Sequence, residues 1–115
     1  QLPVSGAFQS PLMQSAKDKL ETKLDTVHFY DAKFPVYANV TAKATTDKEE
    51  IKKNLFLQVT APVLWEDTIR NMIADGFDEF VEVGPGRVLQ GLVKRIDPSV
   101  ATSGIDKYAD IEKYL

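Results

Sequence analysis

The sequence predicts an α/β fold with a mostly parallel sheet. Short segments rich in β-branched and aromatic residues alternate along the chain with amphipathic segments, and the loops between them are short. This alternation is typical of parallel strands joined by crossover helices, which cover both faces of the sheet. With 115 residues, 43% of them hydrophobic and 27% charged, the chain has the length and composition of one folded domain at most.

The first half of the chain predicts two strands and two helices. Residues 2–8 indicate a strand that ends in a tight loop. A helix over residues 11–26 follows, because Ser10-Pro11 is a strong helix start and apolar residues then recur every three or four positions. Residues 34–40 predict the second strand, and residues 41–47 a loop. Thr46 and Glu49 have capping-box spacing, which predicts a helix from there to about Val59.

The second half continues the alternation. Pro62 predicts the start of a helix that ends at Gly76, and the strand over residues 80–83 follows it. After the turn Gly84-Pro85-Gly86 come three further elements, which are a helix over residues 88–96, a weak strand over 100–105 and a short final helix over 106–115. Parallel sheets place ligands at the carboxyl ends of their strands, so the loops at residues 6–10 and 84–86 are the expected positions for a site.

Charge and composition exclude several classes of protein. Fourteen basic and seventeen acidic residues give a formal charge of −3, and a nucleic-acid binder usually carries a basic face instead. No apolar run approaches the roughly 20 residues of a membrane helix. The absence of cysteine excludes disulfides, thiolate metal sites and a cysteine nucleophile. The chain begins Gln1-Leu2-Pro3 without Met or a signal peptide, so we expect a piece of a longer protein.

The glycine turn does not match a nucleotide-binding motif. Leu89 stands where a dinucleotide fingerprint has its third glycine, and Leu92 and Val93 stand where a P-loop has lysine and serine or threonine. No serine lies in a Gly-x-Ser-x-Gly elbow. His28, the only histidine, has no suitable companions for a metal and is expected in a half-buried strand or edge position. Trp65 is expected in the core, since it is spaced helically with apolar residues.

Several segments together resemble malonyl-CoA:acyl carrier protein transacylase. They are Leu2-Pro3-Val4-Ser5-Gly6-Ala7-Phe8, Ser10-Pro11-Leu12-Met13, Asn39-Val40-Thr41-Ala42, Gln58-Val59-Thr60-Ala61-Pro62-Val63-Leu64-Trp65 and Val81-Glu82-Val83-Gly84-Pro85-Gly86-Arg87-Val88-Leu89, followed by Gly91-Leu92 and Lys94-Arg95-Ile96. The resemblance covers residues 2 to about 105. It implies that residues 1–115 are the C-terminal portion of the large, α/β-hydrolase-like subdomain, and that the serine elbow and the ferredoxin-like subdomain are absent from this chain.

The resemblance also implies a function. The family transfers malonyl from malonyl-CoA to the phosphopantetheine thiol of acyl carrier protein in fatty acid synthesis, through a malonyl-serine ester with a histidine as the base. Coenzyme A and phosphopantetheine are then substrate carriers, and no tightly bound cofactor or metal is expected. The implied partners are acyl carrier protein and the N-terminal portion of the same enzyme, without nucleic acid or membrane, in the cytoplasm.

Three positions carry the implied site. Gln9 stands where the family has its histidine, in a pattern Gly-Ala-Phe-His-Ser. Glutamine has no titratable nitrogen near neutral pH, so it cannot take the serine proton or return it to the leaving thiol. Gln58 matches the glutamine whose main-chain carbonyl orients the base, and Phe8 matches a bulky residue beside the acyl chain. Phe8 can also be explained by core packing alone. Two alternatives remain open. The first is an impaired or non-catalytic fragment, which binds acyl carrier protein or complements another half of the enzyme. The second is a polyketide synthase acyltransferase.

Overall fold

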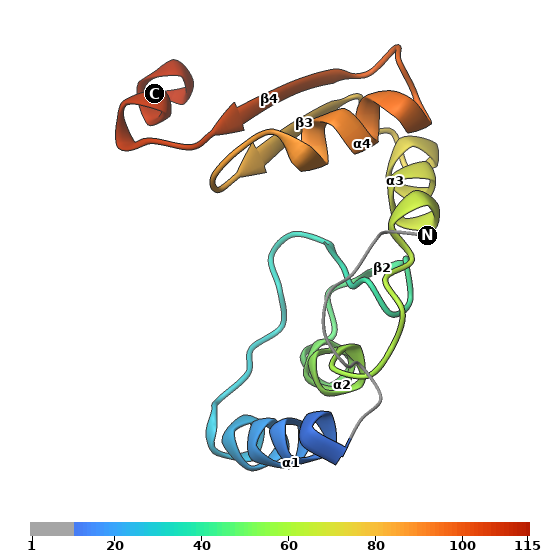
Figure 1. Ribbon diagram of the computed structural model, residues 1–115, viewed down its shortest axis with the longest axis vertical. Helices are drawn as coiled ribbons and strands as arrows, with labels where there is room; N and C mark the ends of the chain where they lie inside the picture. Colours follow the sequence, from blue (N-terminus) through green and yellow to red (C-terminus); the bar gives the residue numbers. More distant parts are fainter. Residues whose placement is uncertain (1–10) are drawn as a thin grey trace. The chain divides into compact units, whose positions relative to one another are not determined.

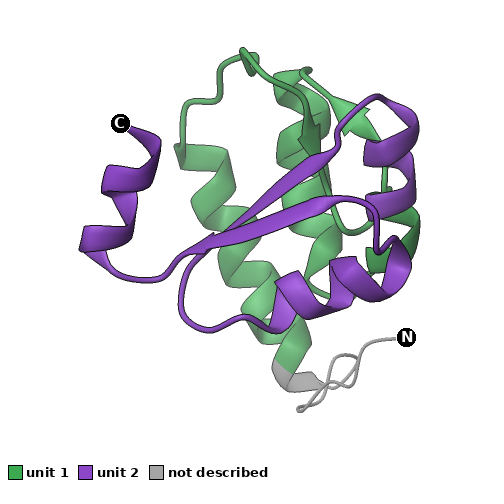
Figure 2. Cartoon of the chain, turned by 90° about the horizontal axis from the view of Figure 1, so that it is seen from above, with its two compact units in different colours: residues 1–68 green, residues 69–115 purple. Residues whose placement is uncertain are grey.

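The computed structural model describes residues 11–115 of the chain. It divides into two compact units, with residues 1–68 in unit 1 and residues 69–115 in unit 2 (Figure 2). The expected strand over residues 2–8 lies outside the described residues. The elements in order are α1 (Pro11–Thr26), β1 (Val36–Tyr37), β2 (Ala44–Thr45), α2 (Lys48–Gln58), α3 (Trp65–Ala74), β3 (Glu79–Val83), α4 (Val88–Ile96), β4 (Ala101–Ile105) and the 3-10 helix η1 (Tyr108–Tyr114) (Figure 1).

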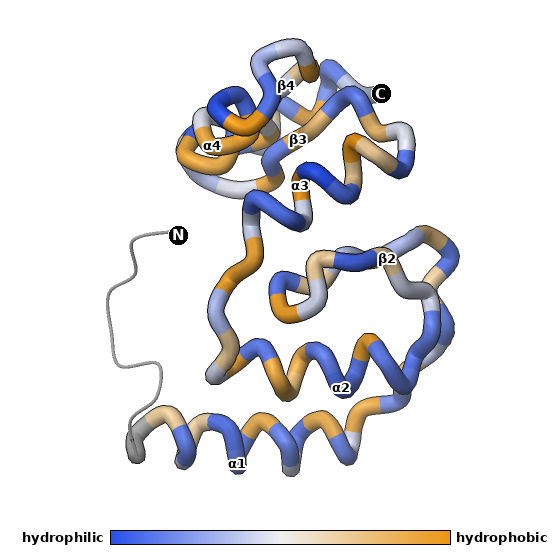
Figure 3. The backbone as a smooth tube through the Cα atoms, turned by 90° about the vertical axis from the view of Figure 1, so that its right-hand side faces the viewer, coloured by the Kyte–Doolittle hydropathy of each residue, from blue (hydrophilic) through white to orange (hydrophobic). Residues whose placement is uncertain are grey.

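In unit 1, α1 packs antiparallel to α2 (Figure 3). Near the end of α1, Asp25 forms an ion pair of 3.3 Å with Lys52 of α2. Near the start of α1, the Lys17 ammonium lies 4.7 Å from the centroid of the Phe56 ring, close to the end of α2. Leu24 is buried on the apolar stripe of α1. The predicted bounds of α1, residues 11–26, are confirmed. The apolar stripe of α1 faces a neighbouring helix, as amphipathic spacing requires.

Helix α2 begins one residue later than its sequence predicts. Asp47, not Thr46, is the N-cap, and its carboxylate accepts the Glu49 N–H at 2.9 Å. A second carboxylate, from Asp31, accepts the Lys48 N–H at 3.0 Å. Two carboxylates thus satisfy N–H groups that the first helical turn leaves without partners, and their charge suits the positive end of the helix dipole.

The predicted strand over residues 34–40 is wrong in length and in pairing. Only Val36 and Tyr37 form a strand, and they pair antiparallel with Ala44 and Thr45, which the sequence assigned to a loop. The chain reverses directly after β1, because the Ala38 carbonyl accepts the Ala42 N–H at 2.9 Å. This hairpin is separate from the parallel sheet of unit 2.

Helix α3 begins at Trp65, three residues after the predicted start at Pro62. The Leu64 N–H donates to the Asn39 carbonyl at 3.1 Å, which holds the preceding segment against the turn after β1 instead of in a helix. The predicted end is confirmed. Gly76 has φ of +105°, its N–H donates to the Ile73 carbonyl, and the following N–H, of Phe77, donates to the Met72 carbonyl. These two bonds are those of a Schellman motif, which favours glycine at the left-handed position.

Unit 2 contains a parallel β3-α4-β4 unit (Figure 1). The strands pair in register from Glu79 with Ala101 to Val83 with Ile105. Along β3 exposed and half-buried residues alternate, so Glu82 points to the face covered by α4. Its carboxylate accepts the backbone N–H groups of Leu89 and Gln90 at 3.3 and 3.4 Å. A strand residue therefore supplies the acceptor at the N-terminus of α4, since the helix has no side-chain N-cap of its own.

Gln90 connects α4 to both strands. Its side-chain amide donates to the Glu82 carboxylate at 3.2 Å. On β4, a Cβ atom added to Gly104 would lie 2.5 Å from the Gln90 amide nitrogen. Gly104 therefore leaves the space that this amide occupies, and a larger residue there would displace the Gln90 side chain.

These observations support a mixed α/β fold with a parallel sheet in unit 2. The strands at 80–83 and 100–105 and the helix at 88–96 are confirmed to within a residue, while the final helix is a 3-10 helix. Within residues 11–115, the parallel sheet has two strands. No helix among these residues combines the length and the apolar character that crossing a membrane requires.

We expect the Glu82 carboxylate to stabilise unit 2 measurably. Glu82→Ala removes the acceptor for two N–H groups of α4 and should lower the free energy of unfolding by about 1–2 kcal/mol, whereas Glu82→Gln, which keeps an acceptor without the charge, should lower it less. Urea unfolding followed by circular dichroism measures both. Glu79→Ala, on the exposed face of the same strand, is the control and should stay within about 0.5 kcal/mol of wild type. Equal losses at both positions would contradict the capping role.

Candidate functional site

A pocket of 180 Å³ lies between the β1-β2 hairpin and α2 in unit 1, and it includes one of the predicted site residues. Its lining combines apolar side chains with three amides and two hydroxyls. The lining residues are Val36, Tyr37, Ala38, Asn39, Thr45, Ile51, Asn54, Leu55 and Gln58. We call this the Gln58 pocket. A mostly apolar wall with a few polar groups is the usual character of a small-ligand site.

Gln58 is the last residue of α2, and its backbone carbonyl is one of those that a helix C-terminus leaves without an intrahelical partner. The neighbouring Leu57 carbonyl accepts the N–H groups of Val59 and Thr60. No N–H among residues 11–115 donates to the Gln58 carbonyl. This oxygen is therefore available to accept a hydrogen bond from a side chain that approaches the end of α2.

The turn after β1 fixes one wall of the Gln58 pocket. Ala42 has φ of +60°, the left-handed region that L-residues other than glycine rarely adopt, and it is only 2% exposed. This conformation costs about 1–2 kcal/mol, which the burial of the residue and the bond from its N–H to the Ala38 carbonyl offset. Asn39, in the same turn, accepts the Leu64 N–H. The hairpin is thus tied to the segment that follows α2.

Asn54 is a polar residue that the sequence did not single out. It is 3% exposed, and its amide nitrogen has no hydrogen-bond partner in the described part of the chain. It lies on α2 three residues after Ile51 and four before Gln58, so one face of the helix carries all three. An asparagine at an apolar position of a helical stripe is the signal that sequence reasoning missed. Burial of an unbonded amide destabilises the fold.

Backbone N–H groups of the glycine turn in unit 2 donate hydrogen bonds to acceptors of the protein itself. Gly84 and Gly86 have φ of +132° and +80°, as a sharp strand-to-helix turn requires. The Gly84 N–H donates to the Ile105 carbonyl at 2.9 Å, and the Gly86 N–H to the Asp106 carboxylate at 3.4 Å. Glu82 accepts two further N–H groups at the start of α4. Four amides of the turn and of the start of α4 are therefore already hydrogen-bonded within the protein, which agrees with the rejection of a nucleotide-binding loop.

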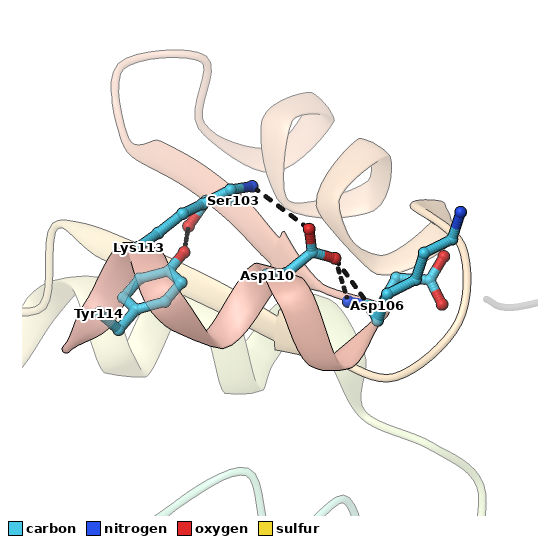
Figure 4. Close-up of polar contacts among 6 residues, drawn as sticks. Ser103, Asp106, Asp110, Lys113 and Tyr114 are labelled. Carbon is cyan, nitrogen blue, oxygen red and sulfur yellow. Dashed lines mark hydrogen bonds and ion pairs between the residues drawn. The ribbon is translucent and has the colours of Figure 1, made fainter.

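A second, polar pocket of 500 Å³ lies at the carboxyl end of the parallel strands. Its lining includes Arg87 and residues of β4 and η1. Figure 4 shows the contacts that hold η1. The Asp110 carboxylate accepts the backbone N–H groups of Asp106 and Lys107, at 3.1 and 2.9 Å, and lies 3.8 Å from the Lys113 ammonium. The bonds from Lys107 and Asp106 lower the pKa of Asp110 below its ordinary value.

Tyr114 anchors the other end of η1. Its hydroxyl lies 2.6 Å from the Ser103 hydroxyl of β4, a hydrogen bond that Figure 4 shows. Since Gly104 faces α4, the adjacent Ser103 points to the opposite face of the sheet. Helix η1 is therefore attached to the face of β4 that α4 does not cover.

Two other sequence expectations differ from the structure. His28 is exposed in the irregular segment after α1, 4.5 Å from the Tyr30 ring between centroids, so the expected half-buried strand position is wrong. The helix ends at Thr26, and His28 has no strand partner. Trp65 is half-buried at the start of α3, and its indole nitrogen is buried without a described partner.

Residues 11–115 contain no group of three or more His, Cys, Asp or Glu residues arranged to hold a metal ion.

Comparisons with known proteins identify relatives. The malonyl CoA-acyl carrier protein transacylase of Bacillus subtilis is 42% identical over 111 residues, which is 96% of this chain and 35% of the relative. The chain is a homologue of malonyl CoA-acyl carrier protein transacylases. It spans about a third of the length of these curated relatives. No protein-family model matches the chain.

Solved structures of malonyltransferases have the same fold as this chain over part of their length. The acyl-carrier-protein S-malonyltransferase of Bartonella henselae superposes on 99% of this chain with a TM-score of 0.86 and 37% identity, and the match covers 36% of that protein. A malonyl-transacylase in complex with its type II polyketide synthase acyl-carrier protein gives a TM-score of 0.83 and 35% identity, over 99% of this chain and 37% of that one. The fold described above thus matches a little over a third of each of these two solved chains.

The described residues include only one of the three expected transacylase site residues. Gln58 ends α2 and lines the Gln58 pocket. Gln9 and Phe8 lie outside the described residues, so their expected places beside Gln58 stay predictions.

Replacing Asn54 by an apolar residue of similar size should stabilise the chain. Asn54→Leu removes a buried amide nitrogen that has no described partner and should raise the free energy of unfolding, measured in urea, by about 1–3 kcal/mol. Asn54→Asp buries a carboxylate at the same position and should destabilise. A leucine variant less stable than wild type would mean that the Asn54 amide is bonded in solution.

The attachment of η1 should weaken in acid. The pKa of folded Asp110 lies below its unfolded value, so its bonds stabilise above the unfolded pKa of about 3.9 and are lost as the pH falls through the lower, folded pKa. We expect the Lys107 amide resonance to shift with pH only below about pH 4, and Asp110→Asn to abolish this dependence. Asp78→Asn, outside the Asp110 contacts, is the control. An unchanged acid transition in Asp110→Asn would contradict the assignment.

Proposed function

We propose that this chain is the C-terminal portion of a malonyl-CoA:acyl carrier protein transacylase. The transferred group is malonyl, which passes from malonyl-CoA to the phosphopantetheine thiol of acyl carrier protein in fatty acid biosynthesis. The observation that carries the proposal is the 42% identity to a curated transacylase across 96% of the chain. Coenzyme A and phosphopantetheine are the substrate carriers, no tightly bound cofactor takes part, and the reaction is cytoplasmic.

The portion of the enzyme that we assign to residues 1–115 belongs to its large, α/β-hydrolase-like subdomain. The parallel β3-α4-β4 unit supports this assignment, because such subdomains are built from parallel strands and crossover helices. The rest of the enzyme, its N-terminal portion, would supply the serine elbow, the ferredoxin-like subdomain and the arginine for the malonyl carboxylate. The match to about a third of the relatives leaves room for these parts.

Helix packing in unit 1 supports a position of Gln9 near Gln58. Helix α1 runs antiparallel to α2, and the Lys17 ammonium of α1 donates to the Thr60 hydroxyl, two residues beyond Gln58, at 3.2 Å. The first residue of α1, Pro11, is about 9 Å from Lys17 along the helix axis, at 1.5 Å per residue. The chain therefore enters α1 at the end of α2 where the Gln58 carbonyl has no described donor. We assign Gln9, two residues before the start of α1, to a position beside this carbonyl.

The proposed chemistry is ping-pong transfer through a malonyl-serine ester. A serine oxygen attacks the thioester carbon, the carbon–sulfur bond breaks, and the coenzyme A thiol leaves with the proton that the base has taken from the serine. The phosphopantetheine thiol then attacks the ester and restores the serine. Gln9 stands at the position of the base. Its amide N–H can donate to the Gln58 carbonyl as an imidazole N–H would, but it cannot carry the proton.

Phe8 is assigned to the wall beside the acyl chain, where its ring would fill the space that a branched extender unit needs. Acyl carrier protein is assigned as the partner that delivers the acceptor thiol. A homologous malonyl-transacylase has been solved in complex with an acyl-carrier protein, which supports this partner.

Two observations favour alternative functions. The glutamine at position 9 favours a catalytically impaired or non-catalytic portion that binds acyl carrier protein or complements another half. The complex with a type II polyketide synthase carrier favours a polyketide pathway. The upstream sequence separates the first alternative from the main proposal, since a Gly-His-Ser-x-Gly elbow followed by an arginine would supply the nucleophile and the malonate-binding group.

Restoring the base should accelerate transfer. In the longer protein that contains this sequence, Gln9→His should raise the rate of malonyl transfer from malonyl-CoA to acyl carrier protein by about 10²–10⁴-fold. The assay follows malonyl acyl carrier protein by mass spectrometry. Gln14→His, at an exposed glutamine of α1, is the matched control and should leave the rate unchanged. Equal, rapid turnover with Gln9 and with histidine would show that position 9 does not supply the base.

A further inference from the structure

Lys17 of α1 contacts α2 and its exit on both sides of Gln58. Helix α1 lies along α2 (Figure 3), and the Lys17 ammonium is 4.7 Å from the centroid of the Phe56 ring. The same ammonium donates to the Thr60 hydroxyl at 3.2 Å. Phe56 is two residues before Gln58, and Thr60 is two residues after it. One cation therefore spans the end of α2 across Gln58, and we call its two contacts the lysine bridge.

The backbone of α2 fixes this end of the helix only weakly. The Leu57 carbonyl accepts both the Val59 and the Thr60 N–H, and the second of these bonds is long, at 3.4 Å. The Gln58 carbonyl has no N–H donor among residues 11–115. Terminal turns of helices open more readily than their centres. The direction of the Gln58 carbonyl therefore depends on contacts from outside α2.

The charge of Lys17 suits this position. Helix α2 has no basic residue in its last turn, so a cation from α1 is the one that complements the negative end of its dipole. A hydrogen bond from an ammonium is stronger than one between neutral groups. Lys17, Phe56 and Thr60 are all half-buried, which reduces the screening of the charge by salt. The lysine bridge is therefore more than an exposed surface contact.

The lysine bridge also leaves the Gln58 carbonyl open. An ammonium has three N–H donors, and a carbonyl at the end of a helix is an acceptor that lysine side chains commonly use. In the described part of the chain, the Lys17 ammonium has the Thr60 hydroxyl and the Phe56 ring as partners instead. The Gln58 carbonyl is thus fixed by a neighbouring cation without being occupied by it.

We propose that Lys17 is a positioning residue of the transacylase site. The lysine bridge holds the end of α2 and thereby sets the direction in which the Gln58 carbonyl meets the group at position 9. Lys17 acts through Phe56 and Thr60 and contacts neither malonyl-CoA nor acyl carrier protein. This role rests on the proposed function, because the direction of the carbonyl affects the reaction only when a base at position 9 donates to it.

The first test is an NMR measurement on the full 115-residue chain. Lys17→Met keeps an apolar stem beside the ring but removes the charge and the donor. It should shift the 13C resonance of the Gln58 carbonyl and accelerate exchange of the Val59 amide by about tenfold or more, since a charge-assisted bond is lost. Lys17→Arg keeps the charge, the donor and the ring contact and should restore both values. Lys19→Met, at an exposed lysine of α1, is the matched control and should change neither.

The other end of the bridge and the other end of α2 separate a local effect from unfolding. Thr60→Val keeps the volume of the side chain but removes the acceptor, so it should reproduce the effects of Lys17→Met and also serves where that variant does not fold. The Ile51 amide donates to the Asp47 carbonyl at 2.9 Å in the first turn of α2. Its exchange should not change in either variant.

The second test is catalytic. In the longer protein that contains this sequence, with Gln9→His in place, Lys17→Met should lower kcat for malonyl transfer by about tenfold or more, because small misplacements of a base are costly. The KM for malonyl-CoA should stay within about twofold, since substrate binding does not use the bridge. Lys17→Arg should recover kcat. Adding Thr60→Val to Lys17→Met should cause no further loss, because both remove the same bond.

Several outcomes would overturn the role of Lys17. These are an unchanged Gln58 resonance and Val59 exchange in Lys17→Met and Thr60→Val, equal acceleration at Ile51 and Val59, and a kcat that Lys17→Met leaves at the parent value. Absence of malonyl transfer in the Gln9→His protein with Lys17 intact would count against the proposed function alone, since the NMR measurements do not use the reaction.

Discussion

The Glu82 carboxylate at the N-terminus of α4 is the contact on which unit 2 depends. It accepts two backbone N–H groups and the Gln90 amide, and thereby joins the end of β3 to the start of the helix that crosses to β4. Because side chains alternate along a strand, a glutamate that faces α4 turns its neighbours Val81 and Val83 to the other face. The same carboxylate occupies the helix end that would otherwise attract a phosphate. Glu82 thus caps α4 from one face of β3, while Val81 and Val83 lie on the other face.

The sequence predicts the elements whose signals are local. The bounds of α1 and α4 follow from apolar spacing, and the end of α3 follows from Gly76, which the left-handed turn requires. The errors lie where distant backbone groups meet. Residues 34–40 are not a long strand, because the left-handed Ala42 reverses the chain, and nothing in an alanine indicates a positive φ. The start of α3 is delayed by a bond between Leu64 and Asn39, twenty-five residues apart.

The candidate site could be predicted only in part. Gln58 is found through its resemblance to a family position, since an amide at the end of a helix has no distinctive local pattern. Asn54 was missed, although a polar residue within an apolar stripe indicates either a buried hydrogen bond or a destabilising group. The role of Glu82 was also missed, because its acceptor function depends on the strand-to-helix turn and not on a capping motif. A side chain that accepts hydrogen bonds from another helix or strand does not lie at a fixed spacing from its partners in the sequence, so no sequence motif identifies it.

The end of α2 also bears on the role that we propose for Gln9. A carbonyl without a described partner accepts a hydrogen bond from an amide N–H as readily as from an imidazole N–H, so the backbone around Gln58 needs no change. In the proposed site, positioning and proton transfer are therefore separate properties of position 9, and a glutamine supplies only the first. On the proposed mechanism, a chain with Gln9 keeps the packing of α1 against α2 and loses only the steps in which the serine gives up its proton and the leaving thiol receives one.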